Sequence, residues 1–393
     1  MSQDTRNAEG EAVTAPKSSR AAQWLPTVQV TLASILLALI VGAFMIVFSN
    51  PEVLKTWTYF FADPTDALSS SAKAVGNSYW ALLDGAFGSW GRIARVLVSA
   101  TPLIVGGLSV SLAFRAGLFN IGAQGQLILG AIASGYIGFT WHLPPVLLLL
   151  VAIAGGLLLG ALWGGIPGLL KARTGAHEVI TTIMLNYLAL KLLSYLLKQD
   201  SFQVPGSNDS KSPVVDPAAR FPAVGGLHLG FFVALLAAVG VWWLLNRTTV
   251  GFEMRAVGAN PEAARTAGMS VTRTYVLVMV LAGALAGLAG AEKVLGHLDP
   301  LTDGVAGSTG FDSITVALLG RATPFGTVLA ALLFGVLDVG GRAMQVQGYA
   351  QLTLTQVLSA LIVLFVAAPA LVRSVFRFSA EESGTTLAKG WNS

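Results

Sequence analysis

Runs of 18 or more apolar residues recur along this chain of 393 residues, and they limit its possible folds more than any other feature. A helix of that length crosses the hydrocarbon core of a bilayer, about 30 Å. Charged residues make up only 11% of the chain, against roughly 25% in a soluble domain. We therefore predict an all-α, polytopic membrane protein with about ten transmembrane segments, one of them short or broken.

Ten segments are predicted from the apolar runs and from the bias of Lys and Arg toward loops on one side of the membrane. They are 26–48, 96–114, 118–140, 146–170, 179–197, 227–245, 275–295, 311–320, 327–341 and 352–372. Segment 311–320 is too short to span upright, so it either crosses as a short segment or is re-entrant. The aromatic-rich stretch 49–94 suits short amphipathic helices on the outer surface.

This topology divides the chain into a transmembrane domain and two tails. Residues 1–22 are predicted to be a disordered cytoplasmic N-terminus, 23–376 the transmembrane domain with a cytoplasmic loop at 246–273, and 377–393 a cytoplasmic tail. We expect a multi-pass protein of the cytoplasmic (inner) membrane with both termini in the cytoplasm. The formal charge of +4 is explained by this topology, and no nucleic-acid partner is predicted.

The segment from Arg115 to Gly130 places three uncharged amides, Asn120, Gln124 and Gln126, among glycines at membrane depth. An unsatisfied polar group in hydrocarbon costs several kcal/mol, so each amide must find a partner or face water. Two interpretations remain open: the amides line a translocation pathway, or they hold helices together. On a continuous helix Asn120 and Gln124 would share a face, whereas Asn120 and Gln126 would not. Asn186, in the middle of segment 179–197, has the same two interpretations.

The cytoplasmic loop contains a short predicted helix over 260–268. Asn260 suits the N-cap, Pro261 the first helical position, and Glu262 the first turn. Gly268 suits a left-handed C-terminal residue. Ala263, Ala264 and Ala267 would give the helix a small face that fits a cleft on another protein.

Several kinds of chemistry have no support in the sequence. The chain has no Cys and no phosphate-binding Gly-x-x-x-x-Gly-Lys-Ser/Thr loop, so we predict no ATPase activity of its own. The four histidines have no metal-ligand spacing, and we predict neither a metal site, a cofactor nor catalytic residues. Asp338 and Arg342 are predicted to pair on one helix face. Two interpretations remain open for Glu178 and Asp312: each stabilises a helix N-terminus, or each takes part in gating. Glycines at 156, 160, 164 and 168 predict close helix packing.

Four stretches, in chain order, resemble permease subunits of ABC importers. They are Phe119-Asn-Ile-Gly-Ala-Gln-Gly-Gln126, Glu178-Val-Ile-Thr-Thr-Ile-Met-Leu-Asn-Tyr187, Arg255-Ala-Val-Gly-Ala-Asn-Pro-Glu-Ala-Ala-Arg-Thr-Ala-Gly268 and Gly310-Phe-Asp-Ser-Ile-Thr-Val-Ala-Leu-Leu-Gly-Arg321. The pattern is most similar to the nucleoside-uptake branch of the branched-chain amino acid and simple sugar permease superfamily.

The resemblance implies a transport subunit that moves nucleosides, or a similar small polar solute, by ATP-driven alternating access. Its implied partners are a cytoplasmic ABC ATPase that uses ATP and Mg, a second paralogous permease, and an extracytoplasmic substrate-binding lipoprotein. The 260–268 helix would be the coupling helix. The implied pathway residues are Phe119, Asn120, Gln124, Gln126 and Asn186, and the implied coupling residues are Asn260, Pro261, Glu262, Ala263, Ala264, Arg265 and Gly268.

Three alternatives to a nucleoside ABC permease differ from it in substrate, in energy source or in the kind of activity. A simple-sugar ABC permease would have the same architecture. An ion-coupled secondary transporter would need a carboxylate near the membrane midplane and inverted repeats, and the sequence makes neither evident. A membrane-embedded enzyme would need clustered His, Asp, Glu or Ser residues, which the sequence also does not suggest.

Overall fold

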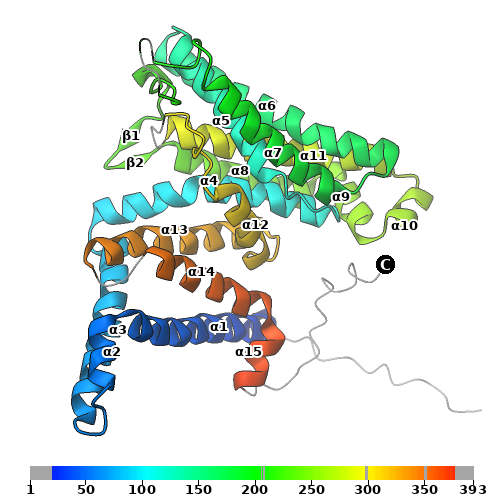
Figure 1. The fold of residues 1–393 in the computed structure, drawn as a ribbon. Coiled ribbons are helices and arrows are strands. Elements are labelled where there is room, and N and C mark those ends of the chain that lie inside the picture. The colour runs from blue at the N-terminus through cyan, green and yellow to red at the C-terminus, as the bar shows by residue number, and fades with distance from the viewer. Residues whose placement is uncertain (1–19, 205, 207–208, 297–299, 349–351, 377–393) are drawn as a thin grey trace, which may run out of the picture.

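The computed structural model describes residues 20–376, apart from 205, 207–208, 297–299 and 349–351 (Figure 1). Its helices are α1 (Arg20–Ser49), α2 (Pro51–Trp57), α3 (Pro64–Phe87), α4 (Trp90–Arg115), α5 (Ala123–Thr140), α6 (Pro145–Thr174), α7 (Glu178–Leu196), α8 (Gly230–Arg247), α9 (Thr249–Ala259), α10 (Pro261–Thr266), α11 (Val271–Leu295), α12 (Thr309–Leu319), α13 (Pro324–Val346), α14 (Leu352–Ala367) and α15 (Pro369–Phe376). A 3-10 turn, η1 (Pro217–Ala219), precedes a short antiparallel hairpin of β1 (Ala223–Val224) and β2 (Leu227–His228).

The fold is helical and polytopic, as predicted. Within the described residues, seven helices are long and apolar enough to cross a membrane by length and composition: α1 over Leu32–Ser49, and α4, α6, α7, α8, α11 and α13. The 18-residue α5 is outside this set because it contains two glutamines, the 16-residue α14 is shorter, and α12 has 11 residues. The total of ten segments therefore stays a prediction.

Helix α4 packs against α8, α11, α12 and α13. On one side of α4, α5 and α6 pack against α11; on the other, α13 leads to α3 and α14, and α14 packs against α1 (Figure 1). The loop helices α9 and α10 lie at one end of the bundle and the β1–β2 hairpin at the other (Figure 1). The start of α1 and the end of α15 both lie at the α9–α10 end (Figure 1). The cytoplasmic placement of the two termini, which lie outside the described residues, stays a prediction.

Glycines let α6 and α11 approach each other to backbone contact. A Cβ at Gly160 would collide with the carbonyl oxygen of Gly283, and a Cβ at Gly287 would collide with the carbonyl oxygen of Gly156. A Cβ at Gly130 of α5 would collide with the carbonyl oxygen of Gly287. The predicted packing role of these glycines is confirmed, since only residues without a side chain fit at such crossings.

Several predicted boundaries are wrong, each for a local reason. Segment 118–140 becomes helical only at Ala123, because Gly117 takes a left-handed conformation (φ 72°) and the next residues form a turn. Residues 227–228 belong to the hairpin, so α8 begins at Gly230. The last predicted segment divides into α14 and α15 at Pro369, whose ring disrupts a continuing helix.

The stretch 49–94 differs most from its prediction. It forms the short α2 and then one continuous helix, α3, of 24 residues. Asp63 caps α3 by accepting hydrogen bonds from the backbone N–H groups of Thr65 and Asp66. Figure 1 shows α3 running across the ends of α1 and α13, roughly perpendicular to them. Near its C-terminus, α3 packs against α13 through Gly85, where a Cβ would collide with Ala343.

Candidate functional site

Asn120 and Gln126 are buried and bound to each other. The Nδ2 group of Asn120 donates to Oε1 of Gln126 over 2.9 Å, and Nε2 of Gln126 donates back to Oδ1 of Asn120 over 3.0 Å. Asn120 is fully buried and Gln126 is 1% exposed. The prediction that these two side chains point to different faces is wrong, because Asn120 lies in the turn before α5 and folds back onto the helix.

Asn186 of α7 binds the beginning of α5. Its Oδ1 accepts from the backbone N–H of Gly125 over 2.8 Å, and its Nδ2 donates to the carbonyl oxygen of Ile121 over 2.9 Å. The first N–H groups of a helix have no partner within that helix. Asn186 therefore serves as a cap supplied by a neighbouring helix.

Gln124 connects α5 to the beginning of α12. Its Nε2 donates to the carbonyl oxygen of Gly307 over 2.7 Å, and its Oε1 accepts from the N–H of Gly310 over 2.8 Å. These two bonds fix the turn that leads into α12. In this conformation, the side-chain amides of Asn120, Gln124 and Gln126 all form hydrogen bonds within the protein.

Phe119 is the one predicted pathway residue that is exposed, at 41%. Its ring contacts Phe114 edge to face, with the centroids 5.3 Å apart. The pathway role of Phe119 and of the four amides stays a prediction.

A cavity of about 1460 Å³ lies between α4, α12 and α13, with α14 closing one side. Its wall on α4 runs from Arg92 to Leu103, and on α13 from Phe334 to Val346. Trp90, at the beginning of α4, donates to the Gly225 carbonyl oxygen of the hairpin over 2.9 Å. The cavity therefore lies in the half of the bundle away from α9 and α10. Its charged lining residues are Arg92, Arg95, Lys293, Asp312, Asp338 and Arg342.

Two carboxylates of this cavity are held in place by neighbours. Oδ1 of Asp338 pairs with the guanidinium of Arg342 (3.1 Å), and its Oδ2 accepts from Ser99 of α4 (2.9 Å). Oδ2 of Asp312 accepts from Ser308 (2.7 Å). The predicted Asp338–Arg342 pair is confirmed. Asp312 lies in the first turn of α12, where a carboxylate stabilises the helix N-terminus.

Sequence reasoning missed this cavity because its walls come from helices that are far apart in the sequence. The signal was present in Asp312 and Asp338, carboxylates within apolar segments. A third, Glu292, is fully buried near the end of α11, with His228 of β2 3.9 Å away. Within the described ranges, no three His, Asp or Glu residues come together as a metal site would require.

The short helix predicted over 260–268 is present as α10, and its capping agrees with the prediction, whereas its role in coupling stays a prediction. Oδ1 of Asn260 accepts from the N–H groups of Glu262 and Ala263, each over 3.0 Å. Pro261 is the first helical residue, and Gly268 has a φ of 84°. A second helix, α9, precedes it and was not predicted.

The small face of α10 is divided between the protein and the solvent. Ala264 is 4% exposed and packs against Val257 and Val271. Ala263 and Ala267 are exposed, and so is the ion pair between Glu262 and Arg265 (3.0 Å). The prediction that all three alanines share one docking face is wrong, because Ala264 anchors the helix to α9 and α11.

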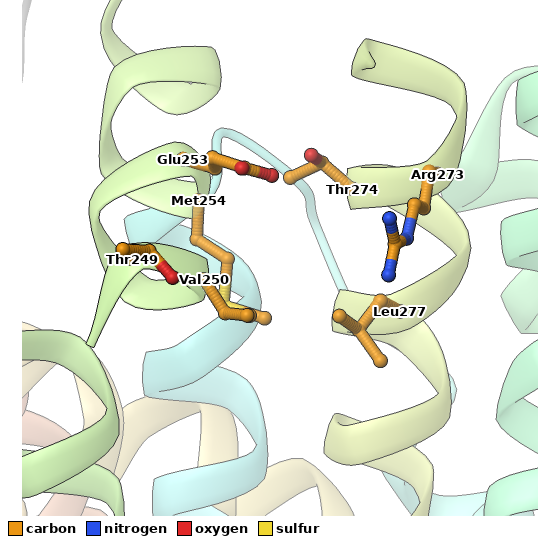
Figure 2. A pocket seen from close by; sticks show the side chains of 7 residues that line it. All are labelled: Thr249, Val250, Glu253, Met254, Arg273, Thr274 and Leu277. Atoms are coloured by element: carbon orange, nitrogen blue, oxygen red, sulfur yellow. The ribbon is translucent and has the colours of Figure 1, made fainter. Parts of the chain in front are cut away.

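The loop before α5 packs directly against the end of α9. A Cβ at Gly258 would collide with the carbonyl oxygen of Arg115. Gly117, in the same loop as Arg115, also lies against the backbone of Gly258. On its other side, α9 faces α11 across a small pocket of about 200 Å³. Figure 2 shows Glu253 of α9 and Thr274 of α11 pointing toward each other there.

Comparison with known proteins decides the family. Residues 92–367, from the first turn of α4 to the end of α14, match the family described as branched-chain amino acid transport system / permease component. This chain belongs to that family. A permease is a transport component, so the match supports a transport subunit over a membrane-embedded enzyme.

Several curated permeases are similar over most of their length. The guanosine ABC transporter permease protein NupP of Bacillus subtilis is 41% identical, covering 78% of this chain and 89% of its own. The nucleoside ABC transporter permease protein NupB of Lactococcus lactis is 36% identical, covering 74% and 84%. The glucose ABC transporter permease protein TsgB13 of Haloferax volcanii is 38% identical, covering 77% and 80%. The resemblance found in the four sequence stretches is confirmed.

Proposed function

We propose that this permease moves nucleosides across the cytoplasmic membrane as a subunit of an ABC importer. The observation that carries the proposal is the 41% identity to a guanosine permease over 78% of this chain. The 36% identity to a second nucleoside permease adds support.

The large cavity suits such a solute. At about 1460 Å³ it exceeds the roughly 300–1,000 Å³ of a typical small-molecule site, so a nucleoside fits with water around it. Its wall combines the apolar side chains of Leu103 and Phe334 with the polar groups described above. Apolar surface accommodates a base, and hydroxyl and carboxylate groups accommodate a ribose. Because the cavity lies away from α10, we propose that it faces outward in this conformation.

The energy would come from a cytoplasmic ATPase that docks at α10. Exposed residues there are Ala263, Arg265 and Ala267, and the capped, glycine-terminated helix presents them rigidly. ATP binding and hydrolysis by the ATPase would move α10 and α9. We propose that this movement reaches the bundle through the contact of Gly258 with the 115–117 loop and closes the cavity on one side while opening it on the other.

Two further partners complete the proposed importer. A second, paralogous permease is supported by Lactococcus lactis, in which NupB and NupC are both similar to this chain, at 36% and 28% identity. An extracytoplasmic binding lipoprotein would deliver the solute to the outward cavity. Four of the proposed pathway residues are amides whose hydrogen bonds are made within the protein: Asn120, Gln124, Gln126 and Asn186. They would bind the solute only when α5, α7 and α12 move. The fifth, Phe119, is already exposed.

Glucose is the second candidate solute, favoured by the 38% identity to the Haloferax glucose permease. The test compares labelled guanosine, uridine and glucose in a strain that lacks other uptake systems for them. We expect nucleoside uptake with the complete importer and none when this chain is deleted. Uptake of glucose alone would replace the nucleoside assignment with the sugar assignment.

A further inference from the structure

Asp312 and Asp338 are carboxylates on helices of a membrane protein, and both border the large cavity. Asp338 lies eight residues before the end of α13, or roughly 12 Å along the helix. Ionisable groups at such depth are costly and typically mark the path of a solute or an ion. The cavity therefore has two acidic groups in its wall, one on α12 and one on α13.

Both carboxylates are oriented by neighbours and still have unused acceptor capacity. An ionised carboxylate offers about four acceptor positions. Asp338 uses part of this capacity on Arg342 and Ser99. Asp312 uses Oδ2 for Ser308, while its Oδ1 accepts no hydrogen bond from the residues that the structure describes. The remaining positions are available for donors in the cavity.

The charge around the cavity favours a neutral partner for these acceptors. Arg342 is paired with Asp338, and Arg92 with Asp84. Arg95 lines the same space, so a cationic solute would meet positive charge there. An anionic solute would meet two carboxylates. A neutral solute with several hydroxyl donors satisfies the carboxylates without adding a charge.

We infer that Asp312 and Asp338 recognise the hydroxyl groups of the sugar ring of the solute. This inference rests on the proposed transport function and names the part of the solute that the permease contacts. A carboxylate accepts well from ribose hydroxyls, as the acidic residue of dinucleotide-binding folds does. Nucleosides and hexoses both contain a ring with hydroxyl groups. The same contacts would therefore serve guanosine, named for one relative, and glucose, named for another.

Gln124 acts as a positioning residue for this site. Its two bonds to Gly307 and Gly310 fix the turn that carries Ser308, the side chain that orients Asp312. The 119–126 segment would in this way position Asp312 without lining the cavity itself.

The test pairs a change in the protein with a change in the solute. In cells that express the complete importer, uptake of uridine and of 2′,3′-dideoxyuridine is measured for the wild type and for Asp312→Asn, normalised to the permease present in the membrane. The ratio of variant to wild type for each solute cancels discrimination by other subunits. Asp303→Asn is the matched control, because Asp303 is an exposed carboxylate of the same region that accepts from Ser194 outside the cavity.

Asp312→Asn should reduce uridine uptake about tenfold, since a hydrogen bond to a charged group is lost, and leave dideoxyuridine uptake within about twofold of wild type. Asp338→Asn provides the same comparison if Asp312→Asn does not reach the membrane. An equal reduction for both solutes, or no reduction for uridine, overturns the inference.

Failure of the proposed function gives a different result. A wild-type importer that takes up glucose but no nucleoside ends the nucleoside assignment, and glucose with its 2,3-dideoxy analogue then tests the carboxylates in the same way. A wild-type importer that takes up neither solute overturns both.

Discussion

Buried amides in this protein bind each other in pairs or cap the end of a helix. The stability that such a pair contributes depends on both of its members. Asn120 and Gln126 exchange two hydrogen bonds in a fully buried setting. Removing one partner leaves the other without its bonds, which costs about 1–3 kcal/mol, whereas replacing both with apolar groups of similar size is nearly neutral. This asymmetry makes the pair testable by single and double substitution.

We expect Asn120→Leu to lower the melting temperature of the purified chain in detergent, because Gln126 is then buried without its reciprocal partner. The double variant Asn120→Leu/Gln126→Leu should melt at a higher temperature than either single variant. Additive losses in the double variant would show that the two amides do not interact, and would return Asn120 to the role of an independent pathway residue.

At the scale of elements, the turn before α5 connects the loop helices to the rest of the bundle. Its residues 115–117 contact Gly258 at the end of α9, and Gln124 in the first turn of α5 holds the turn before α12. A backbone contact of this kind transmits displacement because neither side has a flexible side chain to absorb it.

Gly258→Ala should therefore weaken coupling, since the new Cβ meets the Arg115 carbonyl and must displace α9. We expect less ATPase to co-purify with this variant and ATP-driven uptake to fall, with normal membrane insertion. Gly240→Ala in α8 is the control, because a Cβ there meets nothing within 4 Å. Wild-type ATPase recovery with Gly258→Ala would remove this contact from the coupling route.

Sequence patterns predicted those elements whose cause is local. The Asn260-Pro261 start of α10 and its Gly268 end follow from capping chemistry within a few residues, and the glycine repeats of α6 and α11 follow from helix periodicity. The break at 118–122 was missed because an apolar run looks the same whether its first turn is helical or not. The Ala264 face and the cavity were missed because tertiary contacts decide them.

At the scale of the whole molecule, the proposed solute cavity is lined by the half of α4 nearer the hairpin. The proposed ATPase contact, α10, lies at the opposite end of the bundle from the hairpin (Figure 1). Asp338 and Glu292 are carboxylates on α13 and α11, helices long and apolar enough to cross a membrane, and ion-coupled transporters share this feature. The distinction between ATP and an ion gradient as energy source therefore separates the two mechanisms most clearly.

The most direct test measures nucleoside uptake by the reconstituted importer with ATP inside the proteoliposomes and no ion gradient. We predict uptake with an active partner ATPase, no uptake with an ATPase variant that cannot hydrolyse ATP, and no effect of a protonophore. Uptake by this chain alone, driven by an imposed ion gradient and abolished by the protonophore, would contradict the account.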